Sequence, residues 1–129
     1  MAVAQTDRST ERVLELTLIS TSSSGFPPAP APAQVFTDYG NTFQTKTGRS
    51  FGTWGVQGAV LSTRGGTLIT QVVGTFNTPE GLITSQGIGP AEAIRKTAVT
   101  GGTGSFKKAS GYVEIGQNNQ RVKIHLFNQ

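Results

Sequence analysis

Two charged residues, Arg95 and Asp38, have neighbours that would suit chemistry inside an apolar pocket. Arg95 shares one face of an expected strand with Ala93, Thr97 and Val99, a mostly apolar set. If that face lines an interior, the guanidinium needs an acidic partner or a carbonyl, enolate or carboxylate of a substrate. The alternative is an ordinary surface arginine.

Asp38 has the same parity as Phe36 on another expected strand. Facing inward, it would pair with Arg95 or act as a base, and facing outward it would only end the strand. We take Arg95 and Asp38 as the candidate catalytic residues. The expected role of Arg95 is to stabilise negative charge that develops on a substrate oxygen.

Aromatic side chains are the candidates for the wall of such a pocket. Trp54 shares a face with Val56 and Val60, so it lies either in the core or against a ligand. Tyr112 has the opposite parity to Val113 and is expected to face outward. The candidate substrate-binding residues are Phe36, Trp54, Phe76, Tyr39, Phe26 and Phe106.

Metal and cofactor chemistry find little support in the sequence. His125 is the single histidine, there is no cysteine, and His125 shares a face with Arg121 and Lys123. A lone histidine without a second histidine, a thiolate or clustered carboxylates is a poor metal site. We therefore expect no metal site.

Composition and charge narrow the class of protein. The net charge is +4, but the basic residues are scattered and form no stripe between exposed aromatics, so nucleic acid is not an expected partner. No apolar run approaches the length of a membrane span, and residues 1–10 contain no apolar stretch of signal-peptide length. We expect a cytoplasmic protein that does not associate with membranes.

Alternating apolar and polar residues predict eight strands and no helix. Leu14, Leu16 and Leu18 alternate with polar residues, and 17 glycines suggest strong bends. The expected fold is all-β, an eight-stranded antiparallel up-and-down β-barrel, with a β-sandwich as the alternative. The strands are expected at 12–19, 34–39, 51–62, 67–77, 82–88, 92–100, 110–115 and 120–127.

Domain organisation follows from this pattern. Residues 1–10 are expected to be disordered, and 11–129 to form one barrel domain. Residues 21–34 form a loop rich in serine and proline, with Phe26 at its bend. This loop is either a linker or a flap that closes over the barrel mouth.

Residues 98–115 form a glycine corner between two strands, with Gly101, Gly102 and Gly104 at the reversal and Phe106 placed to plug one end of the barrel. The segments Thr100-Gly-Gly-Thr-Gly-Ser-Phe106 and Ala109-Ser-Gly-Tyr-Val113 resemble the signature of the dirigent and allene oxide cyclase barrel superfamily. Residues 74–87 resemble a strand–turn–strand block of its bacterial allene oxide cyclase-like members.

This resemblance implies an eight-stranded barrel that assembles as a homodimer or homotrimer and holds a hydrophobic small molecule in its lumen. It also implies an activity without a cofactor, namely a cyclase or isomerase in natural-product biosynthesis, Diels–Alder reactions included. Arg95 lies six residues before Gly101, as a pocket arginine of plant dirigents does, whereas Glu92 stands where an aspartate would be expected. The alternative is a non-catalytic carrier or a dirigent-type stereocontrol protein.

Two expected strands also predict self-association. Val13 and Ile19 lie opposite the leucines of the first strand, and Ile69 and Val73 lie opposite Leu68 and Val72. Apolar residues on both faces of a strand are typical of a barrel whose exterior is partly buried against another subunit.

Overall fold

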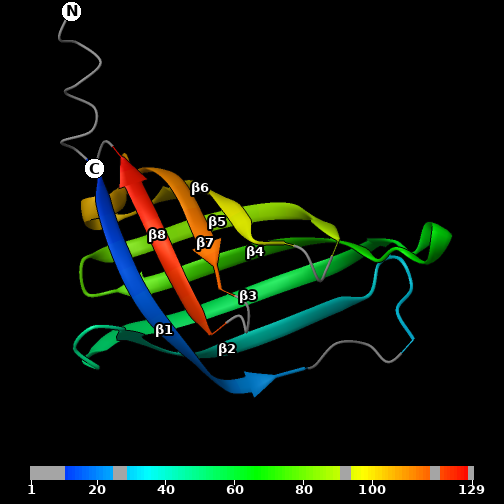
Figure 1. Cartoon of the computed structure of the whole chain (residues 1–129), viewed down its shortest axis with the longest axis horizontal. Coiled ribbons are helices and arrows are strands. Elements are labelled where there is room, and N and C mark those ends of the chain that lie inside the picture. Colours follow the sequence, from blue (N-terminus) through cyan, green and yellow to red (C-terminus); the bar gives the residue numbers. More distant parts are fainter. Residues whose placement is uncertain (1–10, 25–28, 91–93, 117–119, 128–129) are drawn as a thin grey trace, which may run out of the picture.

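The computed structural model describes residues 11–24, 29–90, 94–116 and 120–127. Within them, eight antiparallel strands follow one another in chain order, and β8 pairs with β1 to close a barrel (Figure 1). The expected fold is therefore confirmed. The strands are β1 Arg12–Ser23, β2 Val35–Gln44, β3 Ser50–Ser62, β4 Ile69–Thr78, β5 Gly81–Pro90, β6 Lys96–Gly102, β7 Ser110–Ile115 and β8 Arg121–Phe127.

The predicted inward faces form the core. Leu14, Leu16 and Leu18 of β1 are buried, as are the alternate apolar residues of β8, whereas Glu15 between them is only half-buried. Burying one face of each strand inside a closed sheet removes apolar surface from water without leaving an unpaired edge. These side chains belong to one core cluster with Phe106, and most of them fill one end of the lumen, which we call the filled end.

Phe106 closes that filled end. It lies in a single 3-10 turn, η3 (Gly104–Phe106), and is fully buried. Its N–H donates to the carbonyl of Thr103 (2.9 Å), and the N–H of Ser105 donates to Glu80 in the β4–β5 turn (3.0 Å). The expected plug is therefore present, and η3 is the gold turn at the left-hand end of Figure 1.

The glycine corner is explained by close backbone approach as well as by φ. Gly101 and Gly104 have φ of 153° and 60°, but Gly102 is not among the glycines with positive φ. A Cβ at Gly102 would instead lie 2.3 Å from the carbonyl oxygen of Leu82. Gly102 is therefore required because two strands meet there, and not for a positive φ.

β1 and β2 extend furthest beyond their predicted ends. β1 continues through the serine-rich segment to Ser23, and β2 runs past Gly40 and Asn41, where we expected it to end. Gly40 does not make a turn, since a Cβ there would lie 1.9 Å from the carbonyl oxygen of Ile19 on β1. This glycine allows the backbones of β1 and β2 to approach closely.

The opposite end of the barrel, where the β3–β4 connection lies, is the mouth (Figure 1). Another 3-10 turn, η2 (Arg64–Gly66), lies in the β3–β4 connection. The last described residues of the 21–34 loop bond to β3 there, with the N–H of Ala33 donating to Val60 (2.8 Å) and the N–H of Val60 to Gln34 (2.8 Å). The flap prediction also concerns 25–28, and the disorder prediction 1–10, which lie outside the described residues. No helix in the described chain has the length and apolarity of a membrane span.

Candidate functional site

A cavity of about 350 Å³ occupies the lumen between the filled end and the mouth. This volume falls in the range of pockets that enclose small organic ligands. Its wall is mostly apolar, and every strand of the barrel contributes to it. Among the described residues of this wall, Asp38 is the single ionisable side chain.

Strand register arranges the wall in layers. Asp38 on β2 lies opposite Val56 on β3, which lies opposite Gly74 on β4, which lies opposite Ser85 on β5. The layer nearer the filled end contains the directly opposed pair Trp54 and Phe76. In the layer nearer the mouth, Phe36 lies opposite Gly58, which lies opposite Val72.

Gly74 leaves space in the central layer. A Cβ there would lie 3.4 Å from Oγ of Ser85 and 3.8 Å from the carbonyl oxygen of Gly55, so no backbone atom blocks it. Its φ also lies outside the left-handed region, so an L-residue would be tolerated there. The missing side chain at Gly74 therefore widens the cavity, although the backbone conformation there would accept another residue.

Asp38 is held by hydrogen bonds from the β1–β2 side of the barrel. Its Oδ1 accepts a hydrogen bond from the hydroxyl of Ser20 and another from the N–H of Tyr39 (3.0 Å). No lysine, arginine or histidine of the described chain forms an ion pair with it. The carboxylate is thus oriented by neutral donors, and its charge is uncompensated.

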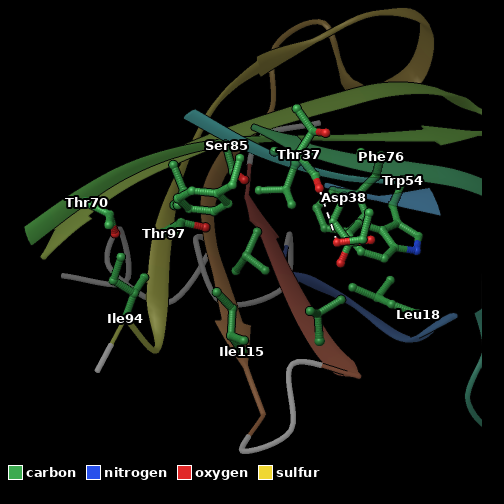
Figure 2. Close-up of a pocket in the computed structure, with 18 residues that line it drawn as sticks. Leu18, Thr37, Asp38, Trp54, Thr70, Phe76, Ser85, Ile94, Thr97 and Ile115 are labelled. Atoms are coloured by element: carbon green, nitrogen blue, oxygen red, sulfur yellow. Dashed lines mark hydrogen bonds between the residues drawn. The ribbon is translucent and has the colours of Figure 1, made fainter. Parts of the chain in front are cut away.

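Some serine and threonine hydroxyl groups also line the cavity away from Asp38 (Figure 2). Thr70 on β4 is almost fully buried, lines the cavity, and its Oγ1 has no hydrogen-bond partner among the described residues. In Figure 2 Thr70 and Ile94 lie at one end of the cavity and Asp38 and Trp54 at the other. Ser85 and Thr97 lie between them. An unpaired buried hydroxyl is available to a ligand.

Four of the predicted site residues line the cavity, namely Asp38, Phe36, Trp54 and Phe76. Trp54 is buried, and its Nε1 has no hydrogen-bond partner in the described part of the chain. The open question of which way Asp38 faces is settled by its place in the wall. Trp54 serves both the core and the cavity.

Three other predicted residues do not line the cavity, which corrects their expected placement. Arg95 precedes β6, is exposed, and its Nη1 lies 3.4 Å from the carbonyl oxygen of Ile94. Ile94 takes the inward direction there, because the strand that would have continued the parity of Thr97 begins only at Lys96.

Tyr39 and Phe106 are absent from the cavity wall for different reasons. Tyr39 is 51% exposed because it follows the inward Asp38 and so faces out. Phe106 is the plug beneath the core rather than part of the cavity wall. Phe26, the remaining candidate, lies outside the described residues.

His125 belongs to a polar cluster on the outer face of the barrel. Its Nδ1 lies 3.0 Å from Oε2 of Glu11 and its Nε2 lies 2.5 Å from Oε1 of Glu114. Tyr112 stacks on the imidazole with ring centroids 4.4 Å apart, and Nζ of Lys96 lies 5.1 Å from the Tyr112 ring centroid. Both His125 and Tyr112 therefore face away from the lumen, as their parity predicted.

Metal binding has no visible site in the described chain. No three of its His, Asp or Glu side chains are grouped so that they could hold an ion. The polar wall residues that the sequence analysis did not propose as site residues are Ser23, Thr37, Thr70, Ser85 and Thr97. Threonine is common in strands and gives no signal of a site.

Comparisons with known proteins agree on the fold. No family model matches the chain, and no curated protein sequence is significantly similar to it. Among solved structures, one named "Pyocyanin demethylase" matches with a TM-score of 0.76 and 16% identity, covering 89% of this chain and 99% of that chain.

Two similar structures are described as Diels–Alderases. AbnU, titled an exo-specific intermolecular Diels–Alderase, matches with a TM-score of 0.71 and 14% identity over 92% of this chain and 97% of its own. AbmU from Streptomyces koyangensis matches with a TM-score of 0.62 and 17% identity over 98% of this chain and 65% of its own. At these identities the likeness is one of fold: a small β-barrel shared with Diels–Alderases and a demethylase.

Proposed function

We propose that this protein is a cofactor-independent cyclase or isomerase that folds a hydrophobic natural-product intermediate in the barrel lumen. The intermediate would be a polyketide, a polyene or a similar chain, and the product a ring formed with defined stereochemistry, as in a Diels–Alder cycloaddition. The observation that carries the proposal is the mostly apolar cavity of about 350 Å³ with a few polar groups placed around it. The shared fold with Diels–Alderases supports it.

Ring closure by a pericyclic reaction makes limited demands on the protein. The reacting ends must be held in contact, which converts a rare conformer of a flexible chain into the bound one. The walls built by Trp54, Phe76 and Val72 supply this through shape. A hydrogen bond to an activating carbonyl adds to the rate if it is stronger in the transition state than in the ground state. The unpartnered Oγ1 of Thr70 is the donor we assign to that role.

Gly74→Leu tests the proposal by filling the cavity without straining the backbone. The probe is a trienone in which an enone is tethered to a diene, so that an intramolecular cycloaddition gives a bicyclic ketone. The wild-type protein should accelerate the reaction and produce an enantiomeric excess, measured by chiral chromatography, and Gly74→Leu should abolish both. The protein-free reaction yields a racemate and sets the background.

Gly55→Ala is the matched control. The backbone of Gly55 borders the cavity, but an added Cβ would lie 3.9 Å from the ring of the exposed Tyr39 and so face outward. Product and enantiomeric excess should therefore match the wild type. A racemate at the background rate with the wild-type protein would contradict cyclisation of this substrate class. If the trienone then still bound in a Gly74-dependent manner, the carrier function would be the one supported, since a cavity with one ionisable side chain in its described wall serves binding without turnover equally well.

A further inference from the structure

We propose that the lumen selects ligands that carry a positively charged nitrogen next to an apolar body, with Asp38 as the residue that recognises the charge. The inference rests on the proposed function, because it names the substrate class for the same cavity. It follows from the charge, the aromatic surroundings and the remaining hydrogen-bonding capacity of one carboxylate.

The charge of Asp38 lacks a counter-ion in the described structure. Its Oδ1 is occupied by the Ser20 hydroxyl and the N–H of Tyr39, and its Oδ2 has no hydrogen-bond partner among the described residues. The exposed Arg95 lies outside the cavity. A carboxylate accepts hydrogen bonds and donates none, so it favours a ligand that brings a donor or a positive charge.

Aromatic rings surround this carboxylate on the cavity wall. Phe36 lies two residues away on the same face of β2, and Trp54 lies diagonally across on β3, beside the partner of Asp38. Phe76 lies directly opposite Trp54, and Figure 2 shows Asp38, Trp54 and Phe76 together at one end of the cavity. Cations are attracted to the faces of such rings, most strongly to tryptophan, when water is excluded.

A carboxylate combined with aromatic walls suits an ammonium or an N-alkylated ring nitrogen. The same arrangement opposes a ligand that ends in a carboxylate, because two like charges would be brought together against a mostly apolar wall. Among the described wall residues no cation would relieve that repulsion. The cavity should therefore bind basic ligands more tightly than ligands with a carboxylate, such as fatty acids.

Three ligands with one apolar body test this directly: adamantylmethylammonium, adamantylmethanol and adamantanecarboxylate. They have nearly the same shape and differ in charge. Trp54 is the single tryptophan of the chain and lines the cavity, so its fluorescence reports binding there, and these ligands do not absorb in the same range. We expect the ammonium to bind about tenfold more tightly than the alcohol, and the carboxylate to bind most weakly.

Asp38→Asn keeps the shape of the side chain and removes its charge, so the ammonium should lose its advantage and bind within about threefold of the alcohol. Glu15→Gln is the matched control, because it removes one carboxylate from the outer face of β1, outside the cavity wall, and the wild-type ratio should persist. The comparison in the wild-type protein tests the inference even if Asp38→Asn does not fold.

The outcomes separate this inference from the proposed function. If the alcohol binds the wild-type protein as tightly as the ammonium, or the carboxylate binds more tightly, selection by Asp38 is refuted while an apolar ligand cavity remains. A ratio unchanged in Asp38→Asn would refute it as well. If none of the three ligands binds and the trienone is not cyclised, the proposed function fails together with the inference.

Discussion

The ring of Phe36 on β2 occupies the space that a side chain at Gly58 on β3 would need. The two residues are directly opposite in the antiparallel ladder, and a Cβ at Gly58 would lie 2.1 Å from Cζ of Phe36. The far end of the ring therefore covers the backbone of β3 at Gly58, and Phe36 forms part of the cavity wall. Removing the glycine should move the ring.

Gly58→Ala is predicted to lower ligand affinity more than it lowers stability. The added methyl group meets the far end of the Phe36 side chain, which is half-buried and can turn away, so overpacking should cost about 1 kcal/mol of unfolding free energy. Binding of adamantylmethanol should weaken by about tenfold, followed by Trp54 fluorescence. Combining Gly58→Ala with Phe36→Leu should restore stability, since the two changes share one contact. Unchanged affinity in Gly58→Ala would show that Phe36 does not form the wall in solution.

Glycines also mark the limit of what the sequence could predict about the fold. The alternation of Leu14, Leu16 and Leu18 and of the apolar residues in β8 identified strands and their inward faces, because one buried face needs period two. Gly40, by contrast, predicted a turn but lies within a strand, where it faces the backbone of Ile19. Sequence alone does not distinguish a glycine needed for a turn from one needed for close approach.

The site was predictable to a similar extent. Parity correctly grouped Asp38 with Phe36 and Trp54 with Val56, but it left open which face of each strand lines the lumen, and the cavity answers that question. Arg95 was misplaced because parity holds only within a continuous strand, and β6 begins after it. The hydroxyl of Thr70 could not be recognised, because its lack of a partner depends on all the strands around it.

Arg95→Leu is predicted to leave ligand binding and turnover within about twofold of the wild type. The guanidinium is exposed and does not line the cavity, so it is not placed to stabilise charge on a bound substrate. The measurement is the rate and enantiomeric excess with the trienone, and Thr70→Val is the comparison variant expected to slow the reaction. A rate loss on the order of a hundredfold in Arg95→Leu would instead restore the catalytic role that the sequence suggested.

Arg12 and Glu80 join β1 to the β4–β5 turn at the filled end of the barrel. Nη1 and Nη2 of Arg12 each donate to one carboxylate oxygen of Glu80 at 2.7 Å. These hydrogen bonds, with a smaller Coulombic contribution, hold the pKa of Glu80 below its ordinary value of 4.5 and raise that of Arg12, against the opposing effect of partial burial. Both side chains remain more than a third exposed, so solvent and salt screen the pair.

The contribution of this pair to stability should therefore depend on pH with a definite sign. Because the folded pKa of Glu80 is lowered, the stabilisation is present above pH 4.5 and is lost as the pH falls below it through the folded value. We expect Glu80→Gln to lower the unfolding free energy at neutral pH by less than about 1 kcal/mol, and less in high salt. Urea unfolding of wild type and variant at neutral and acidic pH measures this. A difference that grew as the pH fell would contradict the assignment.

The outer surface of the barrel is divided by charge. β3, β4 and β5 contain no charged residue, whereas the outer faces of β1 and β8 carry Glu15 and Lys123. On the uncharged side a row of directly paired residues crosses four strands, from Val35 to Ala59, Gln71 and Ile88. Val35 and Ile88 are 62% and 66% exposed. Depletion of charge with exposed apolar residues is typical of the core of an interface.

We predict that wild-type protein is a homodimer or homotrimer held together through this uncharged face, and that Ile88→Lys makes it a monomer. A lysine there would have to be buried without a partner, which an interface tolerates poorly. Ser110→Lys is the matched control, because Ser110 is also exposed but lies on β7, away from the uncharged face, and it should leave the assembly intact. Light scattering at micromolar concentration gives the mass of all three proteins. A monomeric wild-type protein, or dissociation by Ser110→Lys alone, would place the interface elsewhere or remove it.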